Sequence, residues 1–535
     1  MTLSEFAKQS AREYLHSIVF VDDEIYDTAT GHPTEPVAIV PRFKAPFATE
    51  SAHLEPPAAT LEEKPTYHPK HLMESFAREG MVCALYEPRE NFDTGTDSEL
   101  FRLCARADVV IFDWDLYKKD GQNVLPLIAN LVSDSQNTHP HHVRLFAIYT
   151  TKPNLGSVAS SIHDHLKVAN LEIAPVPSLT LNAGATRIIV LGKPGVGSRS
   201  RSDKASEVDE VNLASRLIDE FSQMHEGILP SYALHGLAGV RRNSKRILDK
   251  FHHEMDGPFL LHRALLLEHE DAFEQLPELI AEEALAVLLD DQVPVKVSSD
   301  IAASLSSSLP LTNLAWPPVN GKKAAEKEVL ARKYLAGGPS AIKDDFKVEK
   351  EPYVAFHDAM GCAQTHADKR LAALFDVRTR YFGTKVPELG FGAVVKSGGE
   401  GAAEYSICLM PLCDGIRLKP GTSTSFPFWR LKPPGGGAIG RGIALQVNGT
   451  YVNLVARGKP REMLWLAAFL PNEDGVVSAV WEQPAYSFSA GDSKFEWVAQ
   501  LKPAHAQRIA HDIGQSFSRV AVVEAEWLRL MTDKK

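Results

Sequence analysis

Short, continuously apolar runs alternate with amphipathic stretches over the first 225 residues. Continuous runs of Val, Ile and Phe are typical of parallel strands that are covered on both faces, and an apolar period of three to four residues is typical of helices. Helices are predicted at 4–16 (with Ser4 as N-cap), 69–79, 97–107, 121–132, 158–168 and 207–225, and strands at 17–21, 81–86, 109–113, 143–150 and 187–191. This alternation predicts a doubly wound α/β domain whose five-stranded parallel sheet is covered by helices on both faces.

Two stretches of this region lack sustained periodicity and are expected to be inserted loops. The first, at 24–68, is rich in Pro, Thr and Glu, and the second lies at 170–186. Because the first insertion leaves the first strand directly after Asp22 and Asp23, we expect it to gate any site at that strand end. A polar tract at 195–206 separates the fifth strand from the helix that follows.

Beyond residue 227 the pattern changes twice. Amphipathic runs at 234–253, 260–273 and 276–289 predict helices, whereas alternating residues around 443–447 and the pair Asn448-Gly449 predict a β-hairpin. An apolar stripe predicts a last helix at 504–531. The expected regions are therefore an α/β domain at 1–227, a helical middle at 228–380 and a C-terminal α+β region at 381–535.

Composition excludes several classes of protein. A chain of 535 residues exceeds a single core, and 44% hydrophobic residues are typical of a globular protein. The net charge of −11 and the lack of a helix-turn-helix with a basic recognition helix argue against DNA as a partner. Apolar runs such as 463–470 are shorter than the ~20 residues that span a bilayer. The absence of a secretory signal and the five scattered cysteines predict a cytoplasmic protein.

Five chemically distinctive residues stand at or just after the ends of predicted strands. Asp22 and Asp23 follow the first strand, Asp113 ends the third, Thr150 ends the fourth, and Lys193 follows the fifth. In a parallel sheet these ends meet at one edge. There a carboxylate nucleophile can accept a phosphoryl group while two further carboxylates hold Mg²⁺ through oxygen ligands. A lysine and a hydroxyl can then bind the phosphoryl oxygens.

The motifs that carry these residues are FVDDE, VIFDWDLYKKDG, the strand that ends at Thr150, and Gly192-Lys193-Pro194. They resemble the motifs of CheY-like response-regulator receivers, which have a flavodoxin-like fold. In that family an Asp-Gly pair follows the phosphoacceptor at a fixed distance, and Asp120-Gly121 matches it. The lysine of the family precedes a proline joined by a cis peptide, and Lys193-Pro194 matches this pair in sequence.

The resemblance implies a role for each residue. It implies that Asp113 is the phosphoacceptor and that Lys193 is the phosphate partner. Mg²⁺ would be bound by Asp23 and Asp113, with help from Asp22 and the backbone carbonyl of Asp115. The switch hydroxyl would be that of Thr150 or of its neighbour Thr151. The chain would then be a response regulator in two-component phosphorelay signalling. It would not be an enzyme, beyond autophosphorylation from small donors and autodephosphorylation.

Partners follow from the same resemblance. A receiver implies a histidine kinase, and the output would pass through protein contacts of the C-terminal region. A receiver with long insertions, fused to an unfamiliar helical and β region, resembles the divergent receivers of bacterial conflict (anti-phage) systems. In those systems the partner is a GHKL-type ATPase or a histidine kinase.

Two alternatives remain open. The segment VVIFDWDL also resembles the first motif of haloacid-dehalogenase-like phosphatases, in which Asp113 would be the nucleophile and Asp115 the general acid/base. That family, however, has this motif on its first strand and its Mg²⁺-binding acids downstream, whereas here the acid pair lies upstream. The other alternative is an unphosphorylated pseudo-receiver that acts as a scaffold.

Overall fold

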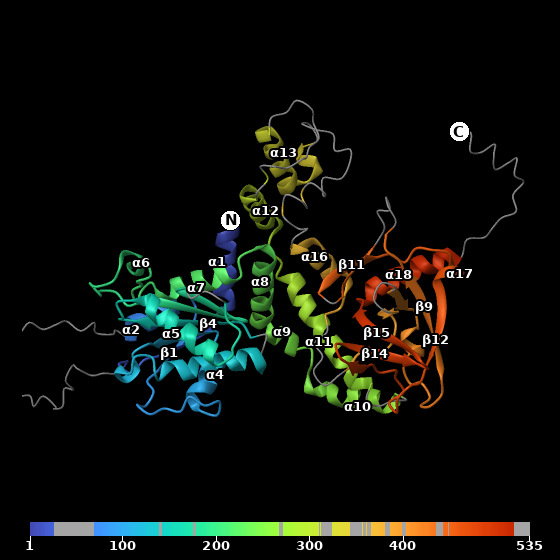
Figure 1. Cartoon of the computed structure of the whole chain (residues 1–535), viewed down its shortest axis with the longest axis horizontal. Helices are drawn as coiled ribbons and strands as arrows, with labels where there is room; N and C mark the ends of the chain where they lie inside the picture. The colour runs from blue at the N-terminus through green and yellow to red at the C-terminus, as the bar shows by residue number, and fades with distance from the viewer. Residues whose placement is uncertain are drawn as a thin grey trace, which may run out of the picture. The chain divides into compact units, whose positions relative to one another are not determined.

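The computed structural model divides the chain into two compact units (Figure 1). The N-terminal unit comprises 1–308 and 332–341, and the C-terminal unit comprises 309–331 and 342–535. The residues that the structure describes are 1–25, 69–138, 142–174, 178–266, 271–309, 311, 324–342, 356, 360, 365–379, 386–398, 403–434, 442–447 and 449–517. The predicted gating loop, apart from its first residues, and the end of the predicted last helix lie outside them.

The N-terminal unit is built on a six-stranded sheet with the order β2-β1-β3-β4-β6-β5. Its strands are β1 (Ser17–Val21), β2 (Val82–Tyr86), β3 (Val109–Asp113), β4 (Arg144–Thr150), β5 (Thr180–Ala183) and β6 (Thr186–Gly192). All neighbouring pairs are parallel except β5 with β6. The doubly wound fold with five parallel strands is therefore confirmed.

The prediction that 170–186 is entirely an irregular insertion is wrong. Its last part forms β5, an antiparallel edge strand that buries Leu181 and Ala183. The chain reverses between β5 and β6 at Gly184, whose φ of +59° favours glycine. The strand is only four residues long, and its own sequence does not predict a strand. Its hydrogen bonds with β6 stabilise the extended conformation.

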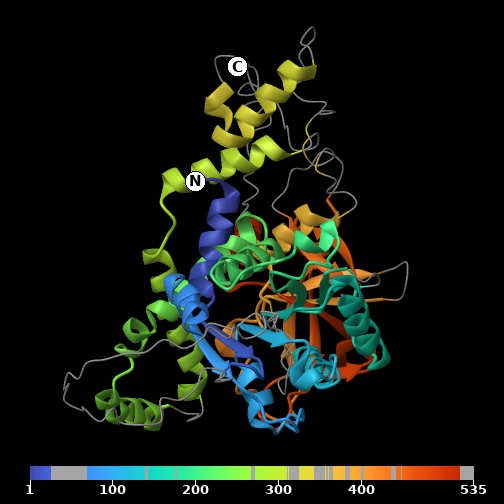
Figure 2. The ribbon, with the colours of Figure 1, turned by 90° about the vertical axis from the view of Figure 1, so that its left-hand side faces the viewer.

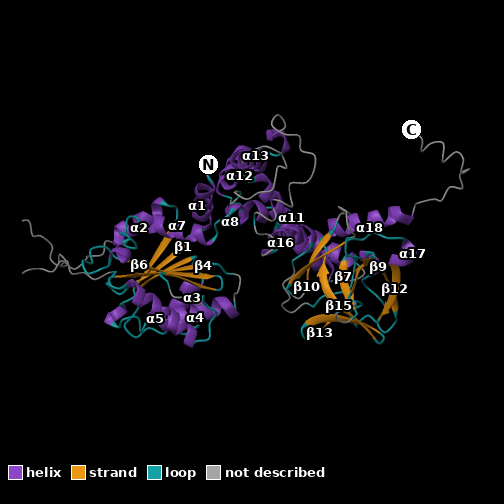
Figure 3. Ribbon diagram, turned by 45° about the horizontal axis from the view of Figure 1, so that its top comes forward, coloured by secondary structure: helices purple, strands orange, loops and turns teal. Residues whose placement is uncertain are grey.

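Helices cover both faces of this sheet (Figure 3). One face carries α1 (Leu3–Tyr14), α2 (Pro69–Arg78) and α7 (Leu213–Met224), and the other carries α3 (Glu99–Ala105), α4 (Val124–Asn137) and α5 (Leu155–Val168). Alternate strand residues enter two separate cores, so Val110 and Phe112 pack towards α3–α5 whereas Val109 and Ile111 pack towards α1, α2 and α7. This double burial explains the continuous apolar runs.

Most of the predicted helix starts in this domain are off by one to six residues, and two of these differences have a clear physical reason. The N-cap of α1 is Thr2 and not Ser4, because Thr2 Oγ1 accepts the Glu5 amide (3.2 Å) while Glu5 Oε2 accepts the Thr2 amide (2.7 Å). Helix α7 begins at Leu213 and not at 207, since residues 206–208 run beside the end of β6. There the Gly192 amide donates to Ser206 (3.0 Å), and the Val208 amide donates to Gly192 (3.0 Å).

The chain continues through helices that remain in the N-terminal unit. They are the short α6 (Arg201–Lys204) before α7, and then α8 (Ile228–Arg242), α9 (Ser244–Leu248), α10 (Asp256–Leu265), α11 (Asp271–Asp290) and α12 (Val295–Ser308). The predicted break between 273 and 276 is absent, since α11 runs through Pro277. A proline removes one hydrogen bond, and the rest of a 20-residue helix remains to bridge the interruption.

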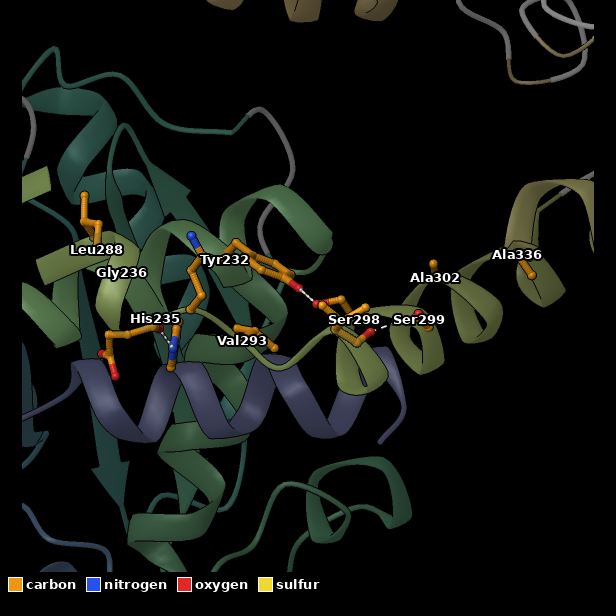
Figure 4. Close-up of a pocket in the computed structure, with 12 residues that line it drawn as sticks. Tyr232, His235, Gly236, Leu288, Val293, Ser298, Ser299, Ala302 and Ala336 are labelled. Carbon is orange, nitrogen blue, oxygen red and sulfur yellow. Dashed lines mark hydrogen bonds between the residues drawn. The ribbon is translucent and has the colours of Figure 1, made fainter. Parts of the chain in front are cut away.

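Helix α1 packs alongside α8 and also contacts α12 (Figure 2). The ring of Phe6 lies 5.0 Å from that of Tyr232, and Glu13 Oε2 lies 2.9 Å from His235 Nδ1. A pocket of about 530 Å³ opens beside these residues (Figure 4), where the hydroxyls of Tyr232 and Ser298 are hydrogen-bonded. This pocket is lined by residues of the helical segments and contains none of the predicted site residues.

The C-terminal unit combines an antiparallel sheet with helices, so the predicted α+β region is confirmed. Its seven-stranded sheet has the order β12-β9-β8-β7-β15-β14-β13. The strands are β7 (Ala393–Ser397), β8 (Glu404–Cys408), β9 (Thr424–Leu431), β12 (Leu464–Phe469), β13 (Val480–Glu482), β14 (Ala485–Ala490) and β15 (Ser493–Gln500). The predicted hairpin pairs β10 (Ile443–Val447) with β11 (Thr450–Leu454).

The described part of the chain beyond α12 contains four further α-helices. They are α13 (Ala324–Gly337), α16 (Ala367–Asp376), α17 (Pro460–Met463) and α18 (Pro503–Phe517). Among the helices that the structure describes, none is both long and apolar enough to cross a membrane.

Arg144 is a buried cation at the amino end of β4, opposite the predicted site. Its Nη2 donates to the Ala105 carbonyl (2.8 Å) and to Asp134 (3.1 Å), and its Nη1 donates to Ser135 (3.0 Å). The guanidinium therefore ties β4 to the end of α3 and to α4. Such a group stabilises the fold only while all of its partners remain in place.

We expect Arg144→Ala to lower the free energy of unfolding of the N-terminal unit by about 3 kcal/mol, because it leaves buried acceptors and the Asp134 carboxylate without their donor. Urea unfolding of the full chain measures this change. Arg78→Ala, at an exposed position, is the control and should leave the transition in place. A shift no larger than that of the control would contradict the structural role of Arg144.

Candidate functional site

Four neighbouring strands end at the same edge of the sheet. Asp22 follows β1, Asp113 ends β3, Thr150 ends β4, and Lys193 follows β6. All four residues are buried, and Asp113 is only 7% exposed. The structure thus brings together residues that are up to 171 positions apart in the chain. Asp23 lies beside them and is partly exposed.

Lys193 bridges two of the carboxylates. Its Nζ lies 2.6 Å from Asp113 Oδ1 and 3.1 Å from Asp22 Oδ2. The second oxygen of each carboxylate accepts a backbone amide, that of Asp115 for Asp113 (2.8 Å) and that of Glu24 for Asp22 (2.9 Å). Asp113 is therefore oriented by an ammonium on one oxygen and by a backbone N–H on the other.

Burial sets the electrostatics of this cluster. It raises the pKa of Asp113 to about 6, against the attraction of Lys193 and with the support of the neighbouring Asp22 charge. Burial also raises the pKa of Asp23. For Lys193 burial opposes the charged form, but the adjacent Asp113 and Asp22 carboxylates outweigh it, so its pKa is raised. Three carboxylates thus lie near one ammonium, which pairs with two of them, and the cluster carries excess negative charge.

The fit to Mg²⁺ rests on this charge and on the donor type. Asp22, Asp23 and Asp113 offer only oxygen, as a hard cation requires, and their charge exceeds that of Lys193. Within the described residues, however, no three His, Cys, Asp or Glu side chains are gathered closely enough to hold a metal ion. The predicted ligand at the Asp115 carbonyl accepts the Lys118 amide (2.7 Å). The residues fit the ion in chemistry and charge, and Mg²⁺ binding stays a prediction.

The loop after β3 has an unusual backbone. Tyr117, Lys118 and Asp120 all have positive φ, at 55°, 58° and 46°, which side chains other than glycine adopt at a cost. The Tyr117 amide donates to Asp23 Oδ2 (2.8 Å). A Cβ at Gly121 would lie 2.3 Å from the Trp114 ring, so the Asp120-Gly121 pair has a steric reason here.

Asp115, the second acid of the phosphatase alternative, has other partners. Its carboxylate accepts the Asp120 amide (2.9 Å) and pairs with Lys152 (3.3 Å). Lys152 also pairs with Asp120 (3.1 Å). In this arrangement the Asp115 side chain is engaged by the loop and by Lys152.

Of the two candidate hydroxyls, Thr150 is buried and Thr151 is exposed. Thr150 Oγ1 accepts the Lys152 amide (3.1 Å), and the Thr150 carbonyl accepts the Lys193 amide (2.8 Å). The expectation of a cis bond at Lys193-Pro194 is wrong, since the one cis peptide among the described residues joins Gln483 to Pro484. The Lys193 carbonyl instead accepts a hydrogen bond from Arg199.

Arg199 is the residue of this region that sequence reasoning missed. Its side chain donates to the carbonyls of Thr150 and Lys193, directly behind the predicted site. The tract that contains it is polar and rich in Ser and Arg, a composition that indicates a solvated loop. A sequence signal for burial was therefore lacking, because the burial depends on how the tract folds back.

We expect the metal-free protein to lose stability as the pH rises through 6. The pKa of Asp113 is higher in the folded state (about 6) than its ordinary value, so the folded state binds this proton more tightly. The stabilisation is complete below the ordinary pKa and is lost as the pH rises through the folded value. Asp113→Asn should then raise the free energy of unfolding by about 1–3 kcal/mol at pH 7.

Urea unfolding in chelator between pH 4 and 8 measures this effect, with Asp97→Asn, at an exposed position, as the matched control. The gain for Asp113→Asn should shrink towards pH 4. A gain that stays constant with pH, or one that the Asp97 variant shares, would contradict the assignment of the raised pKa.

Comparison with known proteins gives one match. The family model of the response receiver domain matches residues 14–198. Searches of the curated proteins and of the solved structures find no match. The matched segment includes Asp22, Asp113, Thr150 and Lys193 and most of the sheet, so the resemblance to receivers is confirmed. The chain therefore contains a response receiver domain at residues 14–198, which indicates a function of the response-regulator kind.

Proposed function

We propose that the receiver domain accepts a phosphoryl group on Asp113 and that the chain is a response regulator in a two-component-type phosphorelay. The observation that carries this proposal is the position of Asp113 at the centre of the carboxyl edge, 2.6 Å from the Lys193 ammonium. A buried carboxylate held between a cation and a backbone amide is oriented for nucleophilic attack. The general receiver family supports the same reading.

The transfer is a substitution at phosphorus. An oxygen of the Asp113 carboxylate forms a bond to phosphorus while the bond between phosphorus and the donor breaks. The donor leaves as acetate from acetyl phosphate, or as the imidazole of a histidine kinase, and an acyl phosphate remains on Asp113. Lys193, which contacts Asp113 in the resting state, then binds a phosphoryl oxygen, and the Thr150 hydroxyl binds a second.

The excess negative charge of the carboxylate cluster would attract Mg²⁺. Asp22 and Asp23 would hold the ion together with Asp113, and the ion would neutralise charge on the incoming phosphoryl group. The Tyr117 amide, which donates to Asp23, orients that carboxylate. The carbonyl of Asp115 would join the ligands after release from the Lys118 amide.

The proposal extends to the partners of the receiver. A receiver domain implies a kinase-type partner, and the layout of the chain favours a GHKL-type ATPase or histidine kinase in an anti-phage system. The C-terminal unit would pass the signal on through protein contacts in the cytoplasm. A net charge of −11 argues against DNA as the target.

We expect acetyl phosphate with Mg²⁺ to label the full chain with one phosphoryl group that base and hydroxylamine remove, and Asp113→Asn to abolish the label. Intact-mass measurement detects the added group, and Asp97→Asn is the control that should be labelled as wild type. Label that persists in the Asp113 variant would remove this residue as the acceptor. An unlabelled wild type would favour the pseudo-receiver, and steady release of phosphate from a phosphomonoester would favour the phosphatase.

We expect Asp23→Ala to weaken Mg²⁺ binding about tenfold or more, because one ligand oxygen is lost while no core side chain changes. Titration calorimetry of the full chain measures the affinity, and circular dichroism verifies the fold. Glu90→Ala removes a more exposed acid near the same loop and should leave the affinity unchanged. Equal affinities in wild type and Asp23→Ala would make the acid-pair assignment wrong.

A further inference from the structure

The polar tract after β6 places a buried arginine behind the phosphorylation pocket. Arg199 is only 4% exposed, and each of its three side-chain nitrogens donates. Nε donates to the Lys152 carbonyl (3.1 Å), Nη2 donates to the Thr150 carbonyl (2.6 Å), and Nη1 donates to the Lys193 carbonyl. Nη1 also pairs with Glu207 Oε1 (3.0 Å). One side chain therefore joins the loops after β4 and β6.

Gly192 leaves the space that this guanidinium occupies. A Cβ at Gly192 would lie 2.5 Å from Arg199 Nη1, closer than two such atoms can approach. The partner of the guanidinium, Glu207, belongs to the segment 206–208 that runs beside the end of β6. Val208 in this segment also accepts the hydroxyl of Tyr149 (2.8 Å). The contacts of Arg199 thus continue into the chain that leads to α7.

We infer that Arg199 is a positioning residue that fixes Thr150 and Lys193 for the phosphoryl group and links them to the segment 206–208. This inference rests on the proposed phosphorylation of Asp113. Thr150 and Lys193 each carry a predicted phosphoryl-binding group on the side chain, and each is held by Arg199 through its carbonyl. Arg199 thereby holds the backbone from which each of these two side chains extends.

The chemistry of the guanidinium suits this task. Its planar fork presents five N–H donors in fixed directions, so it can hold several carbonyls and a carboxylate together. A lysine in the same place offers a single flexible ammonium and cannot reach all of these acceptors in the same geometry. Arg199→Lys therefore keeps the positive charge but loses the set of hydrogen bonds that the planar guanidinium makes. The variant thus separates a positioning role from a purely electrostatic one.

The chain contains a matched comparison for this role. Arg144, at the amino end of β4, is also a buried arginine, and it binds the backbone carbonyl of Ala105 and the carboxylate of Asp134. Arg144→Lys makes the same substitution at the end of the sheet opposite the site. It reports the effect of lost stability alone.

The experiment measures labelling of the full chain by acetyl phosphate, Mg²⁺ affinity and thermal stability for both variants. Arg199→Lys should slow labelling about tenfold or more, since small displacements of reacting groups have large effects on rate, and should leave the Mg²⁺ affinity unchanged. Arg144→Lys should lower the melting temperature and leave the labelling rate unchanged. Labelling of Arg199→Lys at the wild-type rate, or an equal loss in Arg144→Lys, would overturn the inference.

A second variant and a second measurement keep the test decisive. Gly192→Ala places a methyl group in the space of the guanidinium, and it should slow labelling as Arg199→Lys does; a normal rate would overturn the inference. If the wild type takes no label, the proposed function fails. Hydrogen exchange then tests the link itself, because the amides of Lys193 and Val208 should lose protection in Arg199→Lys and keep it in Arg144→Lys. Retained protection in both variants would overturn the link.

Discussion

The ion pair between Lys193 and the two buried acids Asp113 and Asp22 is the interaction on which the receiver edge depends. One ammonium cannot neutralise three neighbouring carboxylates, and burial makes the remaining charge costly. Backbone amides of the surrounding loops compensate part of this charge, since those of Glu24, Asp115 and Tyr117 each donate a hydrogen bond to one of the acids. The raised pKa of Asp113 shows that this compensation is incomplete. The cluster therefore retains excess negative charge.

The sheet could be predicted from sequence because its central strands β1, β3, β4 and β6 are buried on both faces. β3 has the predicted bounds of 109–113, and its residues enter two cores in alternation. Where the prediction failed, the local conformation is stabilised by hydrogen bonds with segments elsewhere in the chain. β5 depends on its pairing with β6, and the late start of α7 depends on the strand-like segment 206–208. Local sequence does not encode such contacts.

The same distinction separates the site residues. Parallel strands have their carboxyl ends at one edge of a sheet, so the sequence predicts that Asp22, Asp113, Thr150 and Lys193 meet there. The structure places all four at that edge. The trans bond at Lys193-Pro194 and the burial of Arg199 depend on the path of the tract that follows β6. Its Ser- and Arg-rich composition is equally compatible with a solvated loop, so no local pattern distinguishes Arg199 from its exposed neighbours.

Helices α8 to α12, which follow the receiver, belong to the same compact unit as the receiver, and this would constrain how a signal leaves the site. Arg199 and Tyr149 both connect the pocket to the segment before α7, and α7 packs against α1. Helix α1 in turn packs against α8 through Phe6 and Tyr232 and through Glu13 and His235. Within the N-terminal unit, a movement of α7 would therefore act directly on α1. Because packed helices change arrangement as units, the layer of α1, α8 and α12 is where phosphorylation of Asp113 would first alter the surface of the N-terminal unit.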